Sequence, residues 1–140
     1  MNYAIEKNEQ YALITLNESV FGGEVPTTFE TLSRNLFREG YSNIIVDFNA
    51  TDEVDAGGVS VIRKINRHCI SEEGLFVLVT KNEEVIDFLD ESKLTDLTIL
   101  PTVEEAVDAI FMNELENDFR SEDDDAYEGF EGGSSNSNDY

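Results

Sequence analysis

Two short, uninterrupted apolar runs constrain the fold of this chain more than any other feature. Residues 43–48 contain Ile44, Ile45 and Val46 in succession, and residues 75–80 begin Leu-Phe-Val-Leu-Val. Strands without polar alternation are typical of a sheet that is buried on both faces and covered by helices. The two runs therefore predict an α/β fold with a central sheet.

The segments around these strands alternate between strand and helix periodicity. Alternating apolar positions in residues 3–7 and 11–16 predict an opening hairpin. The other expected elements are amphipathic helices after residue 27, after the Gly57-Gly58 pair, over 82–90 and from 103, and a short strand over 97–100. The order β-β-α-β-α-β-α-β-α predicts a mixed sheet, parallel in its second half, with helices packed on it.

Two helix starts carry capping signals. Thr27 or Thr28 is expected to cap the first helix, with Glu30 as the capping-box partner of Thr27. Thr102 and Glu105 have the same spacing at the start of the last helix. Both helices are therefore expected to begin with a side-chain hydrogen bond.

The chain is strongly acidic, with 31 acidic and 9 basic residues and a net charge of −22. This charge argues against direct binding to nucleic acid or to an anionic membrane, since both would repel the chain. It favours a protein partner with a basic surface, although solvation alone also explains it. Repulsion between copies predicts a monomer or a weak dimer.

Length and cysteine content predict a small cytoplasmic protein. At 140 residues the chain fits one domain and a tail. It contains no run of 18 or more apolar residues, so no membrane-spanning segment is expected. The N-terminus lacks the features of a signal peptide. Cys69 is the single cysteine, so no internal disulfide is possible, in agreement with a reducing compartment.

The composition changes near residue 113, which predicts a domain over 1–113 and a tail over 114–140. The tail has ten acidic residues and one basic residue, and few aliphatic ones. Such a segment buries too little surface to offset its ordering entropy, so we expect it to be disordered beyond some continuation of the last helix. It is either a solubilising tail or, through Tyr127, Phe130 and Tyr140, a segment that docks on a basic groove.

The acidic loop between the first apolar strand and the following helix is the candidate site. Asp55 precedes the helix as an N-cap would, and Gly57 and Gly58 permit close approach of another backbone. The glycines have a simpler structural explanation, which is tight packing of the helix on the sheet. The residues expected to contact a partner are Asn49, Thr51, Asp52, Asp55, Ala56, Gly57, Gly58, Val59 and Ser60.

Enzymatic and metal chemistry are not expected. His68 and Cys69 are adjacent in a predicted helix and point in different directions, and no second His or Cys exists to complete a metal site. With its one His on a helix, the chain also offers no arguable Ser-His-Asp triad. The chain also lacks a phosphate-binding loop with Lys, so no cofactor is predicted. A receiver domain is disfavoured because Asn17-Glu18-Ser19 provides no acidic pair after the opening strands.

Over about residues 3–112 the chain resembles the STAS domain of anti-sigma factor antagonists. The family motif Asp-Ser-Ser-Gly-Leu corresponds to Asp55-Ala56-Gly57-Gly58-Val59, and the family's Asp-Leu-Ser corresponds to Asp47-Phe48-Asn49. The resemblance implies an interaction module that binds a GHKL-type anti-sigma kinase or a related regulator through this loop. The kinase phosphorylates the second Ser of the motif, where this chain has Gly57, so binding without the switch is implied. An acidic tail is not a feature of the family.

Two alternatives stay open. Ser60 or Thr51 is a possible phosphosite, which would make the protein a phospho-regulated antagonist or relay. STAS domains without the serine also serve in stressosome-like assemblies and in lipid or ABC transporter complexes, so a transporter subunit is the other alternative.

If the loop binds the partner, Gly58→Asp or Val59→Glu is expected to weaken binding and leave the fold intact.

Overall fold

The computed structural model describes residues 1–94 and 96–128, which form two compact units. The first unit spans Met1–Ile110 and the second begins at Phe111. The last part of the predicted tail, residues 129–140, lies outside the described residues. The elements in chain order are β1 (Tyr3–Lys7), β2 (Ala12–Leu16), β3 (Val20–Phe21), α1 (Val25–Arg38), β4 (Ile44–Asp47), β5 (Glu53–Val54), α2 (Ala56–Ser71), β6 (Phe76–Val79), α3 (Glu83–Glu91), β7 (Thr98–Leu100) and α4 (Val103–Glu128).

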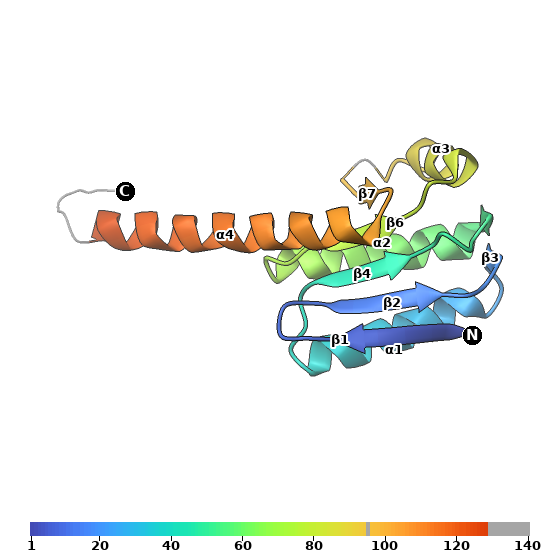
Figure 1. Cartoon of the computed structure of the whole chain (residues 1–140), viewed down its shortest axis with the longest axis horizontal. Coiled ribbons are helices and arrows are strands. Elements are labelled where there is room, and N and C mark those ends of the chain that lie inside the picture. Colours follow the sequence, from blue (N-terminus) through green and yellow to red (C-terminus); the bar gives the residue numbers. More distant parts are fainter. Residues whose placement is uncertain (95, 129–140) are drawn as a thin grey trace. The chain divides into compact units, whose positions relative to one another are not determined.

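A mixed five-stranded sheet forms the centre of the first unit (Figure 1). Its strand order is β1-β2-β4-β6-β7, with β1 antiparallel to β2 and every later pair parallel. Leu13, Ile45 and Val77 are neighbours across the three central strands. The predicted α/β class, with an opening hairpin and a parallel second half, is confirmed.

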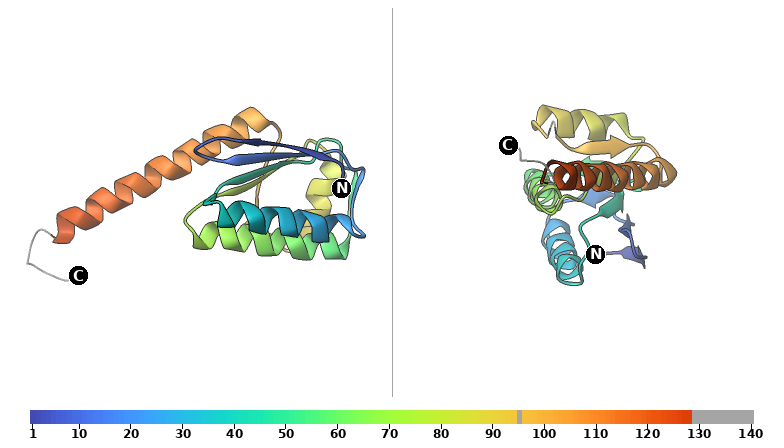
Figure 2. Two further views of the ribbon diagram at one scale, coloured as in Figure 1. Left: turned by 90° about the horizontal axis from the view of Figure 1, so that it is seen from below. Right: turned by 90° about the vertical axis from the view of Figure 1, so that its left-hand side faces the viewer.

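Each face of the sheet is covered by helices, as the apolar strands require. Helices α1 and α2 lie on one face, and the first turns of α4 lie on the other (Figure 2). Ala106 and Ile110 of α4 are fully buried in a cluster with Leu13, Ile45 and Val77. Alternate residues of the strands supply the second cluster, which faces α1 and α2.

Four fully buried phenylalanines fill the core beneath α1 and connect it to the carboxyl end of β4. Phe21 packs edge-on against Phe29 with ring centroids 5.4 Å apart, and its ring is tilted against that of Phe48 with centroids 5.0 Å apart. Phe29 also contacts Phe76 of β6. Phe48 is the last buried residue before the acidic loop, so this cluster fixes the point at which the loop leaves the sheet.

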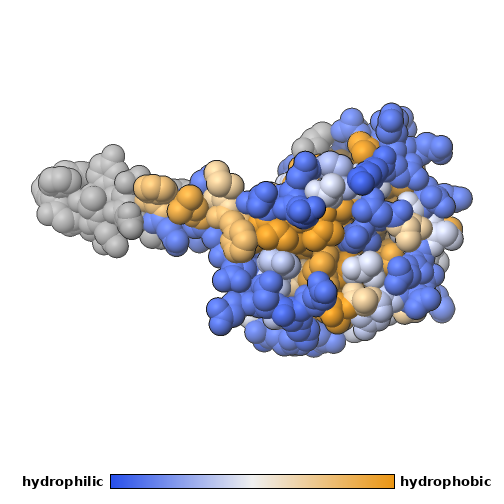
Figure 3. All heavy atoms as spheres, viewed as in Figure 1, coloured by the Kyte–Doolittle hydropathy of each residue, from blue (hydrophilic) through white to orange (hydrophobic). Residues whose placement is uncertain are grey.

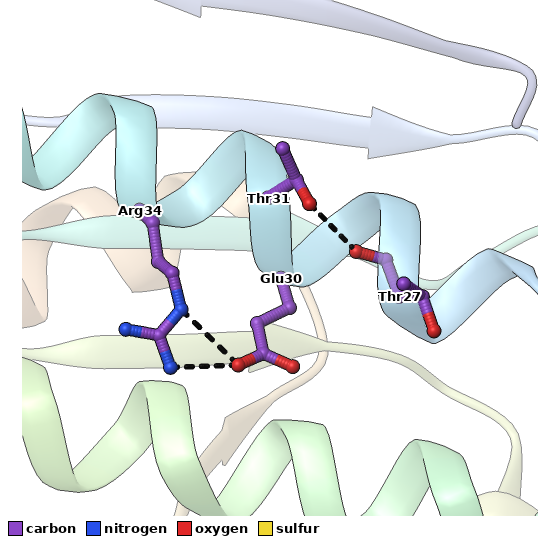
Figure 4. Close-up of polar contacts among 4 residues, drawn as sticks. All are labelled: Thr27, Glu30, Thr31 and Arg34. Atoms are coloured by element: carbon purple, nitrogen blue, oxygen red, sulfur yellow. Dashed lines mark hydrogen bonds and ion pairs between the residues drawn. The ribbon is translucent and has the colours of Figure 1, made fainter.

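The predicted cap of α1 is wrong. The helix begins at Val25, with Pro26 in its first turn and no side-chain hydrogen bond at its N-cap, Glu24. Pro is favoured there because its ring presets φ and its missing N–H is not needed. Figure 4 shows the residues of the expected box inside the helix instead: Glu30 accepts from the Arg34 guanidinium at 2.7 Å. The predicted cap of α4 is confirmed, since Thr102 Oγ1 accepts from Glu105 N at 3.1 Å.

The second unit is described as the continuation of α4 from Phe111 to Glu128. Composition predicted some continuation of the last helix, and residues 114–128, the first fifteen of the predicted tail, are helical. This segment contains four Glu residues, and Glu loses little side-chain freedom in a helix, which is consistent with this extension.

Candidate functional site

The acidic loop between β4 and α2 is held in place by the segment that precedes α1. Within the loop, β5 pairs in parallel with the two-residue strand β3. The backbone N–H of Asp52 donates to the carbonyl of Ser19 at 2.8 Å, and that of Asp55 donates to the carbonyl of Phe21 at 3.2 Å. The loop is therefore part of a small second sheet rather than a free connection.

Asp55 is the N-cap of α2, as predicted, and it also connects two loops. Its Oδ1 accepts from Gly58 N at 2.7 Å and its Oδ2 accepts from Gly23 N at 3.0 Å. Hydrogen bonds from the backbone N–H groups of Gly58 and Gly23 lower the pKa of the Asp55 carboxyl, because they stabilise its ionised form. The carboxylate therefore fixes both the start of α2 and the turn before α1.

The two glycines at the start of α2 have different surroundings. A Cβ on Gly57 would meet one atom within 4 Å, Asp55 Oδ1 at 3.4 Å, so this position is open. A Cβ on Gly58 would lie 2.6 Å from the carbonyl oxygen of Phe21 and 2.9 Å from the side chain of Val54. Gly58 is needed for the close approach of α2 to the β3–β5 pair, whereas Gly57 is free to carry a side chain.

The expectation that Gly58→Asp or Val59→Glu leaves the fold intact is therefore wrong. Gly58 has no room for a side chain, and Val59 is only 7% exposed in the core beneath α2. Placing a carboxylate at either position would bury a charge or displace the β3–β5 pair. Substitutions that test the loop surface have to be made at exposed positions.

Six of the nine predicted site residues present surface to solvent, and three do not. The exposed residues are Asn49, Asp52, Asp55, Ala56, Gly57 and Ser60. Gly58 and Val59 are buried, and Thr51 is 1% exposed. The Thr51 hydroxyl donates to the Glu18 carbonyl at 2.8 Å, so a kinase could reach it only after the loop opens. Ser60 is the candidate phosphosite whose side chain is accessible.

Sequence reasoning missed the contribution of residues 18–23. Glu18, Ser19, Phe21 and Gly23 all provide backbone groups that bind the acidic loop. The Gly22-Gly23 pair was the available signal: Gly23 adopts φ +61°, and a Cβ on Gly22 would lie 2.7 Å from Asp55 Oδ2. One glycine of each pair, Gly22 and Gly58, is the position at which the two segments lie too close together for a side chain.

The Cys69 thiol of α2 is buried in an unreactive setting. Burial raises the pKa of the Cys69 thiol to about 12, so the thiolate is not formed at neutral pH. The ring of His68 stacks on Phe37 with centroids 3.8 Å apart.

Among the described residues, no group of three or more His, Cys, Asp or Glu side chains is arranged to hold a metal ion. Within the same residues, no helix combines the length and apolar character needed to cross a membrane.

Comparison with known proteins gives one family and several structures. The STAS domain family model matches residues 2–106. A search among curated protein sequences gives no match. The solved structures that are similar include a Thermotoga maritima protein assigned as an anti-sigma factor antagonist, with TM-score 0.69 and 22% identity over 77% of this chain and 93% of that one.

Two further structures extend the comparison. Unphosphorylated SpoIIAA, an anti-sigma factor antagonist, matches with TM-score 0.67 and 20% identity over 78% of this chain and 96% of that one; SpoIIAA of Bacillus is also known in a phosphorylated form. A chain of the stressosome, a signal integration and transduction hub, matches with TM-score 0.61 and 21% identity over 76% of this chain and 95% of that one. At these identities the structural matches establish a shared fold.

The adjacent glycines provide a matched pair of substitutions. We expect Gly58→Ala to reduce the free energy of unfolding by about 1–3 kcal/mol, because its Cβ would overlap backbone. Gly57→Ala should be neutral or stabilising by up to about 1 kcal/mol, because Ala favours a helix and the space is open. Urea unfolding of both variants checks this, and equal stabilities would contradict the geometry of the α2 start.

The bridge made by Asp55 predicts a specific dependence on pH. A carboxyl whose pKa is lowered on folding stabilises the fold above its unfolded pKa, and this contribution is lost as pH falls through the lowered folded pKa. Asp55→Ala should therefore lower the thermal unfolding midpoint at pH 7, and the difference from wild type should shrink toward about pH 3. Asp87→Ala, an exposed position on α3, is the control. A deficit in Asp55→Ala that stays constant with pH would argue against the bridge.

Proposed function

Because this chain belongs to the STAS domain family, we propose that it is a protein-interaction module of the anti-sigma factor antagonist type. The proposed interface is formed by the exposed residues of the acidic loop and by the first turn of α2. The proposed partner is a GHKL-type anti-sigma kinase or a related regulator. The protein would act by sequestering that partner, with no chemistry of its own.

The open position at Gly57 is the observation that carries this proposal. It lies at the exposed start of α2, which Asp55 caps. From the resemblance of Asp55-Ala56-Gly57-Gly58-Val59 to the family motif, we take it to stand in the place of the phosphorylated serine. A glycine here keeps a small surface at the helix N-terminus and provides no hydroxyl for a kinase. We therefore infer that partner binding is constitutive.

The charge of the loop indicates the chemistry of the partner surface. Asp52, Glu53 and Asp55 are exposed on the loop. A phosphate added beside these carboxylates would be repelled, which favours an unmodified loop. The same carboxylates complement Lys and Arg side chains, so the partner is expected to present a basic surface to this loop.

The accessibility of Ser60 supports one alternative within the same family. Ser60 is exposed as the fifth residue of α2, at the beginning of its second turn, near the helix N-terminus that favours a phosphate. A phospho-regulated antagonist or relay could therefore use Ser60. The buried hydroxyl of Thr51 makes that residue the weaker acceptor.

Charge reversal in the loop tests the proposed interface. The partner is first recovered by pull-down with the tagged full-length protein from its native cells. Asp52→Lys/Glu53→Lys should then weaken the affinity for that partner by about tenfold or more, because both side chains are exposed and complementary charges would become repulsive. Glu9→Lys is the control, since it lies in the β1–β2 turn at the opposite end of the sheet.

The outcome of this experiment separates the proposed functions. Unchanged affinity in Asp52→Lys/Glu53→Lys would remove the loop from the interface. Recovery of an ATPase and a permease in place of a kinase or sigma-factor regulator would support a transporter subunit instead.

Restoring the missing hydroxyl tests the absence of the switch. Gly57→Ser should be tolerated by the fold, because the position is open. With the recovered kinase and ATP, the variant should gain one phosphate and lose affinity, whereas the wild-type protein should stay unmodified and bind equally with and without ATP. Intact-mass spectrometry gives the readout. A phosphate on the wild-type protein that is lost in Ser60→Ala would establish the Ser60 alternative.

A further inference from the structure

The second unit carries a cluster of exposed apolar side chains that the acidic loop does not use. Phe111, Met112, Leu115 and Phe119 on α4 are 47%, 57%, 52% and 60% exposed. They are half of the large hydrophobic residues that are exposed among the described residues, and they fall within nine consecutive positions. Isolated exposed apolar residues are common, but a cluster of this density marks an interaction surface.

These four residues form one face of the helix. At about 100° per residue, the spacing of Phe111, Leu115 and Phe119 places them along a single stripe, and Met112 borders it. Figure 3 shows hydrophobic atoms along this part of α4. We name Phe111, Met112, Leu115 and Phe119 the α4 stripe. Spacings of i, i+4 and i+8 are those by which one amphipathic helix packs against another.

Charge determines what kind of helix fits the stripe. Glu116 and Asp118 are exposed and flank it on its two sides, and residues 111–119 contain no basic residue. A second copy of this chain would place carboxylates against carboxylates. A helix with an apolar face bordered by Lys or Arg would complement both the stripe and its edges.

We propose that the α4 stripe is a docking site for a basic amphipathic helix of a partner protein, separate from the acidic loop. The apolar side chains would supply the buried area, and Glu116 and Asp118 would orient the partner helix. This site goes beyond the function proposed for the loop, because it lies on a different unit of the chain.

Binding of a designed peptide to the full-length protein tests this site. The probe is a labelled helical peptide with Leu at i, i+3, i+4 and i+7 and Lys at the flanking positions, measured by fluorescence anisotropy at physiological salt. Leu115→Ser/Phe119→Ser should weaken its binding by about tenfold or more, because the buried apolar contacts are lost. Asn117→Ala, on the opposite side of the helix, should leave the affinity unchanged.

A matched pair of charge reversals separates local from overall electrostatics. Glu116→Lys/Asp118→Lys and Asp52→Lys/Glu53→Lys change the net charge of the protein equally. The first variant should weaken peptide binding much more than the second. This pair also distinguishes the two sites, since the loop variant should lose the native partner of the loop and keep the peptide.

Three results would overturn the proposal. Binding that is insensitive to Leu115→Ser/Phe119→Ser would show that the peptide is held by charge alone. A concentration-dependent dimer, seen in sedimentation of the wild-type protein and absent in that variant, would assign the stripe to a second copy. Co-sedimentation of the wild-type protein with zwitterionic vesicles, lost in the same variant, would assign it to lipid.

Discussion

Burial of β4 and β6 on both faces is the constraint on which the rest of the fold depends. These strands have no polar face, so helices must cover the sheet on both sides, with α1 and α2 on one and the start of α4 on the other. Parallel strands of this kind require crossover connections, and each connection leaves a loop at the carboxyl end of the preceding strand. The loop after β4 is the one that the sequence makes acidic and rich in glycine. Its place at the carboxyl end of the central strand β4 follows from the core, and its exposed residues are those of the proposed interface.

The sequence predicted those elements whose apolar residues follow a regular pattern over several positions. The apolar runs of β4 and β6 and the helical stripe of α2 are of this kind, and they were sufficient for the fold class. The cap of α2 was also predictable, because Asp55 acts on a backbone N–H three residues away. The start of α1 was not, because Pro26 in the first turn outweighed the hydroxyl of Thr27. Local signals compete at a helix end, and the sequence alone does not rank them.

The features that the sequence did not reveal are contacts between distant segments. Strands β3 and β5 have two residues each, which is too short for any periodicity, and they are defined only by their pairing. The second hydrogen bond of Asp55, to Gly23, joins positions 32 residues apart. Gly57 and Gly58 also differ only through a distant contact. Phe21 leaves no room for a side chain at Gly58, whereas Gly57 is open. Assignment of one glycine to packing and the other to the surface needed the structure.

The pairing of β3 with β5 has a consequence for the energetics of recognition. A loop that is already hydrogen-bonded to a neighbouring segment has few conformations to lose when a partner arrives. The entropy of ordering this loop is therefore lost when the chain folds, not when it binds. Affinity at such a surface is set by shape and charge complementarity. The proposed interface would accordingly behave as a rigid body that meets its partner with little rearrangement.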